Sequence, residues 1–138
     1  MTPGRVLALD PGSRRVGTAV SDPLGISAQP HGVLDATDPR LMEQIARLGI
    51  DLGVERIVVG LPVSLNGSEG PAAAEARRFA AEVARSTGLP VDLLDERFTT
   101  VSAERVLVQA GLSGRRRRAV RDRVAAAILL QAYLDGGR

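Results

Sequence analysis

The sequence predicts an α/β fold with a five-stranded mixed sheet, in the strand order 3-2-1-4-5, and helices on both faces. Two continuous apolar runs, at residues 6–9 and 57–61, are typical of strands that are covered on both faces, and a third buried strand is predicted at 91–94. Segments with helical spacing precede and follow the second run. Because strand-helix-strand crossovers are right-handed, we expect these three strands to lie parallel and side by side. Their carboxyl ends then share one edge of the sheet, which is where ligands bind in open α/β sheets.

The first apolar run ends at Asp10, directly before a turn. Pro11-Gly12 is typical of a turn, and residues 16–20 then alternate between larger and smaller side chains with the period of a strand. This pattern predicts an antiparallel hairpin that displays Asp10 at the edge of the sheet. An acid at the tip of a buried strand needs a partner. Capping of the turn is the simpler alternative role for Asp10.

The other elements follow from periodicity and turn residues. Asp38 is expected to cap a helix that starts at Pro39. Gly25 and Pro30 favour an edge position for the third strand. The expected ranges are a strand over 24–34, helices over 39–53, 71–86 and 99–110, and a last helix that carries Asp122 and ends near 134. The length of 138 residues suits one domain, over residues 1–138.

The composition limits the kind of metal site that the chain can form. There is no cysteine and a single histidine, His31, which excludes thiolate and multi-histidine sites. Any bound metal must therefore have oxygen ligands, and such ligands suit the hard cations Mg²⁺ and Mn²⁺.

Three acids stand where the predicted fold would bring them together. Asp10 ends the first strand, and Asp95-Glu96 ends the third buried strand. Asp122 leads an apolar stripe of the last helix, where a pair with Arg118 is the alternative to a ligand role. Only one of Asp95 and Glu96 can face the site, and the longer Glu96 is favoured. The three acids would form an oxygen-only site for one or two cations, which can assist phosphoryl transfer.

The basic residues are compatible with a nucleic-acid partner. Net charge is only +2, but all 18 basic residues are arginine, whose planar guanidinium matches phosphate. The base composition of the genome is an alternative reason for the absence of lysine. Because the chain has only two phenylalanines, one tyrosine and no tryptophan, we expect contact with backbone phosphates and no platform for stacked bases.

The chain shows no signal for a membrane or for export. No apolar run reaches the roughly 20 residues of a membrane span, and the amino-terminal residues lack the apolar core of a signal peptide. We therefore expect a cytoplasmic protein without a membrane partner.

Four segments together carry a family resemblance. They are Leu-Ala-Leu-Asp-Pro-Gly-Ser-Arg-Arg-Val-Gly-Thr-Ala-Val-Ser-Asp at 7–22, Val-Val-Gly-Leu-Pro at 58–62 with Asn-Gly-Ser-Glu-Gly at 66–70, Asp-Glu-Arg-Phe-Thr-Thr at 95–100, and the apolar stretch at 122–134. In this order they resemble the signatures of the YqgF (RuvX) family over nearly the whole chain. The resemblance implies a ribonuclease H-like fold related to the RuvC Holliday junction resolvases. It also implies a bacterial, cytoplasmic, metal-dependent nuclease that matures the 5′ end of 16S ribosomal RNA and, in some members, cuts branched DNA.

The resemblance also implies site residues, with one departure. By position, Asp10 is the metal ligand of the first strand, Glu96 or Asp95 is the acid of the Asp-Glu-Arg motif, and Asp122 is the ligand from the helix. Resolvases of the RuvC type usually have an acid at the end of the fourth strand. This chain has Gly-Leu-Pro at 60–62 there, so that the second ligand must come from the next strand.

Seven arginines are expected near the acidic edge, where they would bind substrate phosphates with salt-dependent affinity. They are Arg14 and Arg15 in the first turn, Arg97 beside Glu96, and Arg115, Arg116, Arg117 and Arg118 ahead of Asp122. Several alternatives stay open. Arg97 could pair with Asp95, the run at 115–118 could be a solvated loop, and the loop at 62–70 could close over the substrate or only connect two elements.

The leading interpretation is a hydrolase, a Mg²⁺- or Mn²⁺-dependent nuclease that acts on structured RNA, in particular pre-16S rRNA, or on branched DNA. The alternative is a non-catalytic RNA-binding or ribosome-assembly factor. A lobe of a sugar-kinase or actin-like fold suits the chain less, because those folds enclose ATP between two lobes and 138 residues supply one. The sequence leaves both a monomer and a homodimer open.

Overall fold

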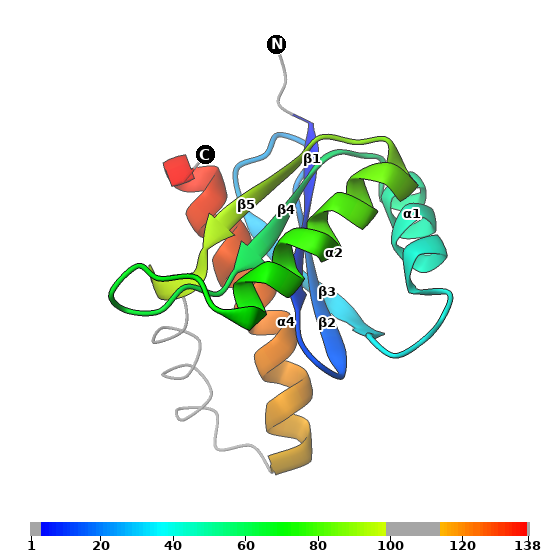
Figure 1. The fold of residues 1–138 in the computed structure, drawn as a ribbon. Coiled ribbons are helices and arrows are strands. Elements are labelled where there is room, and N and C mark those ends of the chain that lie inside the picture. Colours follow the sequence, from blue (N-terminus) through cyan, green and yellow to red (C-terminus); the bar gives the residue numbers. More distant parts are fainter. Residues whose placement is uncertain (1–3, 99–113, 138) are drawn as a thin grey trace.

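The computed structural model describes residues 4–98 and 114–137. Five strands form one sheet: β1 (Arg5–Pro11), β2 (Arg15–Ser21), β3 (Ala28–Asp35), β4 (Val54–Leu61) and β5 (Val91–Asp95). Their order is β3-β2-β1-β4-β5 (Figure 1). β1 pairs antiparallel with β2 and parallel with β4, β2 pairs antiparallel with β3, and β4 pairs parallel with β5. The predicted mixed sheet and its strand order are confirmed.

Helices cover both faces of the sheet, as predicted. α1 (Leu41–Leu52) and α2 (Pro71–Thr87) lie on one face, and α4 (Gly114–Ala132) lies on the other, against β1, β2 and β3 (Figure 1). A 3₁₀ turn, η1 (Glu96–Phe98), follows β5 directly, and a π-helical turn, η2 (Tyr133–Gly137), follows α4. Within the described ranges, none of the helices has the length and apolarity that a membrane crossing requires.

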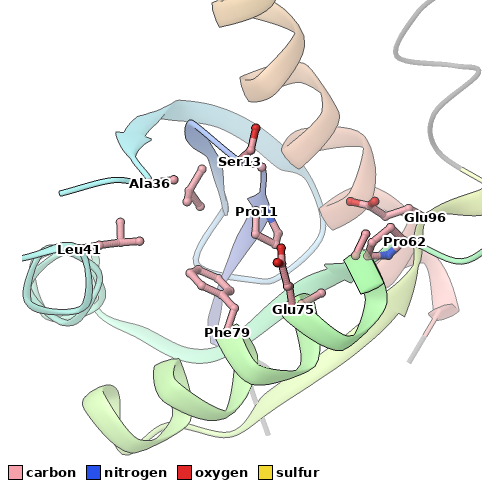
Figure 2. Close-up of a pocket in the computed structure, with 12 residues that line it drawn as sticks. Pro11, Ser13, Ala36, Leu41, Pro62, Glu75, Phe79 and Glu96 are labelled. Atoms are coloured by element: carbon pink, nitrogen blue, oxygen red, sulfur yellow. The ribbon is translucent and has the colours of Figure 1, made fainter. Parts of the chain in front are cut away.

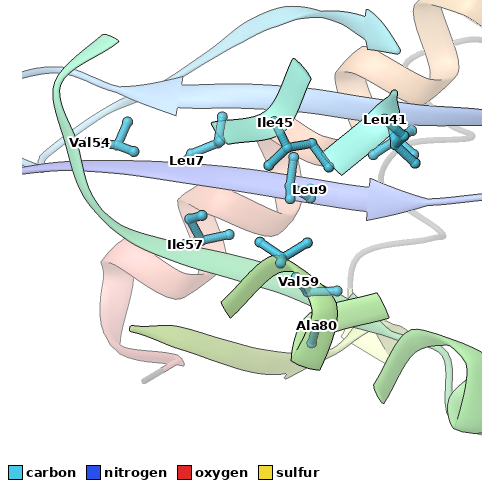
Figure 3. Close-up of a cluster of buried hydrophobic side chains, with 10 residues drawn as sticks. Leu7, Leu9, Leu41, Ile45, Val54, Ile57, Val59 and Ala80 are labelled. Carbon is cyan, nitrogen blue, oxygen red and sulfur yellow. The ribbon is translucent and has the colours of Figure 1, made fainter. Parts of the chain in front are cut away.

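Side chains of β1 alternate between two separate cores. Leu7 and Leu9 belong to the core on the side of α1 and α2 (Figure 3), whereas Val6 and Ala8 pack with residues of α4. Both faces of the strand are thus covered, which explains its continuous apolar run. The same alternation places Asp10 on the face that α4 covers.

The strand register brings the acidic ends of β1 and β5 to one edge of the sheet. Asp10 of β1 lies opposite Gly17 of β2, and Leu61 at the end of β4 lies opposite Asp95 at the end of β5. Glu96 follows as the first residue of η1. The predicted shared carboxyl edge is therefore present.

The first helix begins later than predicted. Its N-cap residue is Arg40, and Asp38 instead accepts a hydrogen bond from the Arg40 backbone N–H at 2.8 Å. The carboxylate of Asp38 therefore holds a turn ahead of the helix, which delays the start of α1 to Leu41.

The third strand is also shorter than predicted and begins at Ala28. The Asp22 carboxylate accepts hydrogen bonds from the backbone N–H groups of Ile26, at 2.6 Å, and Ser27, at 3.1 Å. These bonds hold the preceding segment in a turn, so that it cannot join the sheet.

Two further predictions concern the segment before the last helix. The helix expected over 99–110 lies outside the described residues. The arginines at 115–118 lie in the first turns of α4 and not in a loop, although their side chains are outside the description.

Close contacts fix the position of α4 on the sheet. A Cβ atom at Gly17 would lie 2.6 Å from the carbonyl carbon of Asp122 and would overlap its oxygen, so the helix can approach β2 only because residue 17 is glycine. Farther along α4, the Gln131 side chain accepts a hydrogen bond from the Ala28 N–H at 2.9 Å. These contacts determine where α4 holds Asp122.

Substitution Gly17→Ala should therefore displace the α4 backbone. We expect the free energy of unfolding, measured by chemical denaturation, to fall by about 1–3 kcal/mol, as is usual for overpacking. The matched control is Gly32→Ala in β3, where the atom nearest to an added Cβ is Thr18 Oγ1 at 3.9 Å. Equal effects of the two substitutions would contradict the close approach of α4 at Gly17.

Candidate active site

Asp10 and Glu96 form a carboxyl pair at the carboxyl edge of the sheet. Their side chains are hydrogen-bonded to each other. Burial raises the pKa of Asp10, the hydrogen bond from Glu96 acts in the opposite direction, and the charge of Asp122 raises it again. Burial, the hydrogen bond to Asp10 and the charges of Asp10 and Asp95 raise the pKa of Glu96 to about 9. At neutral pH, Glu96 therefore keeps its proton and donates it to Asp10.

Glu96 reaches this position across Gly60 of β4. A Cβ atom at Gly60 would lie 2.9 Å from the carboxyl carbon of Glu96 and would overlap Oε1. The carboxyl group thus fills the space that a side chain at position 60 would need. This gives a physical reason for the departure seen in the sequence, because an acid at residue 60 and Glu96 in its present position would exclude each other.

Asp95 has a different partner and does not face the acid pair. The backbone N–H of Arg97 donates to Asp95 Oδ1 at 2.9 Å, and Arg97 Nε donates to Asp95 Oδ2 at 2.8 Å. These hydrogen bonds lower the pKa of Asp95. The ion pair that the sequence left open as an alternative for Arg97 is present. Of the two neighbouring acids, Glu96 is the one that contacts Asp10.

Asp122 lies next to the pair but is bound to Arg15. The Arg15 Nε atom of β2 donates to Asp122 Oδ2 at 2.5 Å, and the two side chains are 36% and 24% exposed. The backbone of Asp122 lies against Gly17, which is opposite Asp10 in the sheet, and the charge of Asp122 raises the pKa of Asp10. The pair with Arg118 that the sequence allowed involves a side chain outside the described part.

The three acids are not arranged as a ready metal site. Among the described residues, no group of three or more His, Cys, Asp or Glu side chains is placed to hold a metal ion. These acids are instead engaged in two other interactions, the proton shared by Asp10 and Glu96 and the ion pair that holds Asp122. The donors themselves fit a hard divalent cation, because all are carboxyl oxygens and two of them have pKa values raised by burial.

The arginines differ in how they are engaged. Arg15 and Arg97 are bound to acids. Arg14 is exposed in the turn between β1 and β2 and has no ion pair with the residues that the structure describes. The first turns of α4, which hold residues 115–118, extend past the sheet beyond this turn (Figure 1). The run therefore starts at the acidic end of the molecule.

A pocket of about 510 Å³ opens beside the acid pair, on the face of α1 and α2 (Figure 2). Its lining includes Pro11, Val16, Leu41, Glu75, Phe79 and Glu96. Neither Glu75, which is exposed, nor Phe79, which is half-buried, was singled out from the sequence as a site residue. Their spacing of four residues, which puts Glu75 and Phe79 on one face of α2, was the available signal.

Comparison with known proteins identifies relatives over nearly the whole chain. A family model described as RuvX, Holliday junction resolvase, matches residues 4–136. A protein of Syntrophomonas wolfei is 44% identical over 134 residues, which are 96% of this chain and 95% of that protein. A protein of Moorella thermoacetica is 47% identical over 135 residues, which are 95% of this chain and 94% of that protein. Both carry the name "Putative pre-16S rRNA nuclease".

Solved structures show the same fold. RuvC of Thermus thermophilus in complex with a Holliday junction substrate matches with a TM-score of 0.62 at 19% identity, and the match covers 98% of each chain. A second structure of RuvC from this organism matches with a TM-score of 0.55 at 16% identity, over 96% of this chain and 97% of that one. The sheet and its helices are therefore a ribonuclease H-like fold, as the resemblance implied. Since both the family model and these relatives match nearly its full length, the chain belongs to the RuvX family.

Proposed function

We propose that this protein is a metal-dependent nuclease that hydrolyses phosphodiester bonds in structured RNA, at the 5′ end of pre-16S rRNA. The observation that supports the proposal most strongly is that Asp10 is hydrogen-bonded to Glu96 at the carboxyl edge of the sheet and that the charge of Asp122 acts on Asp10. The names of the relatives favour ribosomal RNA as the substrate, and the family description makes branched DNA the second candidate. Maturation of ribosomal RNA would place the protein in the cytoplasm.

Asp10, Glu96 and Asp122 would hold Mg²⁺ or Mn²⁺. A divalent cation bound there supplies Lewis acidity, which polarises the phosphodiester and makes a water molecule more acidic. The protein then needs no nucleophile of its own, in agreement with a chain that has no cysteine and one histidine. For all three acids to act together, Glu96 has to lose its proton and Asp122 has to leave Arg15.

The arginines would position the substrate. Arg14 is exposed in the turn that follows Asp10 in the sequence and can bind a phosphate directly. Arg15 becomes available to a phosphate once it releases Asp122. Arg97 stays bound to Asp95, and its Nη1 also donates to the Leu65 carbonyl at 3.5 Å, so it ties the loop at 62–70 to the end of β5.

Removal of any one acid should strongly reduce cleavage without unfolding the protein. We expect Asp10→Asn, Glu96→Gln and Asp122→Asn each to reduce cleavage of a pre-16S rRNA substrate in Mn²⁺ by about a hundredfold or more, since loss of even an outer partner of a metal site costs about 10- to 100-fold. Gel analysis of the products with Mg²⁺, with Mn²⁺ and with EDTA gives the rates.

The control for this series is Glu82→Gln, an exposed position on α2 that should leave the rate unchanged. Cleavage by Asp10→Asn at the rate of the parent protein would contradict the proposal. RNA binding without cleavage by the parent protein would instead favour a non-catalytic ribosome-assembly factor.

Binding of Mn²⁺ should release the proton shared by the acid pair. Glu96 normally titrates at 4.5 but has a pKa of about 9 in the folded protein, so that the ion competes with a proton between these values. The apparent affinity for Mn²⁺ should rise by about tenfold per pH unit between about pH 6 and 8. Calorimetry in buffers of different ionisation enthalpy should show that about one proton is released for each ion bound. Glu96→Gln should remove the dependence.

The same linkage has the opposite sign for the protein without metal. The folded state holds the Glu96 proton more tightly than the unfolded state. The contribution of this proton to the free energy of unfolding is therefore fully present below about pH 4.5 and is lost as pH rises toward 9. Affinity for Mn²⁺ that does not change with pH would contradict the shared proton.

Substitution should distinguish the role of Arg15 from that of Arg14. In Arg15→Gln, Asp122 loses its partner, so affinity for Mn²⁺ should increase by about two- to fivefold, the range expected for a partly exposed ion pair. Affinity for RNA without divalent ions should fall in both Arg15→Gln and Arg14→Gln, whereas Mn²⁺ affinity should change only in the former. Fluorescence anisotropy and calorimetry measure the two quantities, and identical behaviour of the two variants would show that the ion pair does not restrain Asp122.

A further inference from the structure

The pocket beside the acid pair has features that the proposed hydrolysis does not use. Its volume of about 510 Å³ lies within the range of small-molecule sites. Its walls are mainly apolar and include Val16 and Leu41, which are buried, and Phe79, which is half-buried. These residues belong to the packed interior, whereas other parts of the lining, such as Ser13 and Pro62, come from turns and loops.

One wall is formed by the side chains of Glu75 and Phe79. Both project from the same face of α2 toward Pro11 (Figure 2). An aromatic ring in this position offers a flat surface on which another ring can stack. The pocket therefore suits a planar ligand, which would lie against Phe79.

The charge in the pocket comes from carboxyl groups. Glu75 is exposed and has no hydrogen bond or ion pair with the residues that the structure describes, while Arg77 on the same helix is bound to Glu69 at 2.7 Å. A carboxylate at the mouth repels phosphate but accepts hydrogen bonds from N–H groups. Among the bases of RNA, guanine presents an imino N–H and an amino group side by side, and these two donors match the two oxygens of one carboxylate.

The pocket adjoins the candidate active site through one shared residue. Glu96 contributes to its lining and also forms the acid pair with Asp10. A nucleotide next to a phosphate held at the acid pair would therefore have its base at the mouth of the pocket. Proteins that read RNA sequence usually splay bases out of the strand, stack them on aromatic side chains and hydrogen-bond their Watson–Crick edges.

We propose that this pocket receives an unstacked guanine base of the RNA substrate, next to the scissile phosphate. Phe79 stacks on the base, and the Glu75 carboxylate accepts hydrogen bonds from its N1–H and 2-amino groups. This inference rests on the proposed nuclease function and adds a base preference to it, which phosphate contacts alone cannot give. It also revises the expectation that no side chain of this chain serves to stack a base.

A set of matched RNA substrates tests the inference. The cleavage site is first mapped in a precursor RNA with the parent protein and Mn²⁺. Each nucleotide that flanks the site is then replaced in turn by guanosine, inosine, adenosine and an abasic residue, and kcat/KM is measured for each. At one flanking position we expect guanosine to exceed adenosine by about tenfold, the usual discrimination of a good bidentate contact. Inosine, which lacks the 2-amino group, should fall between them.

Variants of the pocket identify the side chains responsible. Glu75→Gln should remove the preference for guanosine over inosine, and Phe79→Leu should bring every base close to the abasic rate. Ala72→Leu, at an exposed position of the lining, should also bring every base close to the abasic rate, because the larger side chain fills the pocket. This variant controls for an effect of Phe79→Leu on folding. Glu82→Gln, on the same helix but outside the lining, should keep the preference.

The outcomes separate this inference from the proposed function. Equal cleavage of guanosine, inosine and adenosine substrates at every flanking position would overturn the base pocket and leave the nuclease proposal standing. Retention of the preference in Glu75→Gln would do the same. If the parent protein cuts none of the RNAs, both the proposed function and the base pocket fail.

Discussion

Electrostatic repulsion among three acids at one edge of the sheet is the constraint on which the site depends. Two different interactions relieve it. Asp10 and Glu96 share a proton, because burial and then their hydrogen bond raise the pKa of Glu96 to about 9, and Arg15 neutralises Asp122. Neither interaction needs to be permanent, because a cation can replace the shared proton and a phosphate can compete for Arg15. Under the proposed function, the site would be stable without a cation and would still accept one, and cation binding would be linked to pH and to the availability of Arg15.

Two glycines provide the space in which these acids meet. Gly17 lets the α4 backbone approach β2 closely enough to place Asp122 beside Asp10, and Gly60 leaves room for the Glu96 carboxyl group. Both glycines lie in strands, where glycine ordinarily weakens the sheet but permits another group to come close. The ends of the parallel strands supply two acids to one edge, and the docking of α4 supplies the third. Small residues are thus as important to this site as the acids.

Much of the fold could be predicted from the sequence, because β1 and β4 contain continuous apolar runs and β2 alternates. Asp10 could be placed at the edge for the same reason. The choice between Asp95 and Glu96 could not be made, since it depends on the 3₁₀ turn after β5 and on the hydrogen bonds between Asp95 and Arg97. The pair of Arg15 with Asp122 joins residues that are 107 positions apart, which local patterns cannot reveal. The pocket residues of α2 could not be predicted for a related reason. Side chains that line a cavity recur along a helix with the same spacing as side chains that are buried in a core.

The central claim is that Asp10, Glu96 and Asp122 form one binding site for a divalent cation once the shared proton and Arg15 have been displaced. The most direct measurement is a crystal structure of the protein grown with Mn²⁺ above pH 8, with anomalous diffraction to locate the ion. We predict a peak in contact with carboxylate oxygens of all three acids, with the Arg15 guanidinium no longer bound to Asp122. A bound ion elsewhere on the molecule, or no ion at this edge while Asp122 remains paired with Arg15, would contradict the claim.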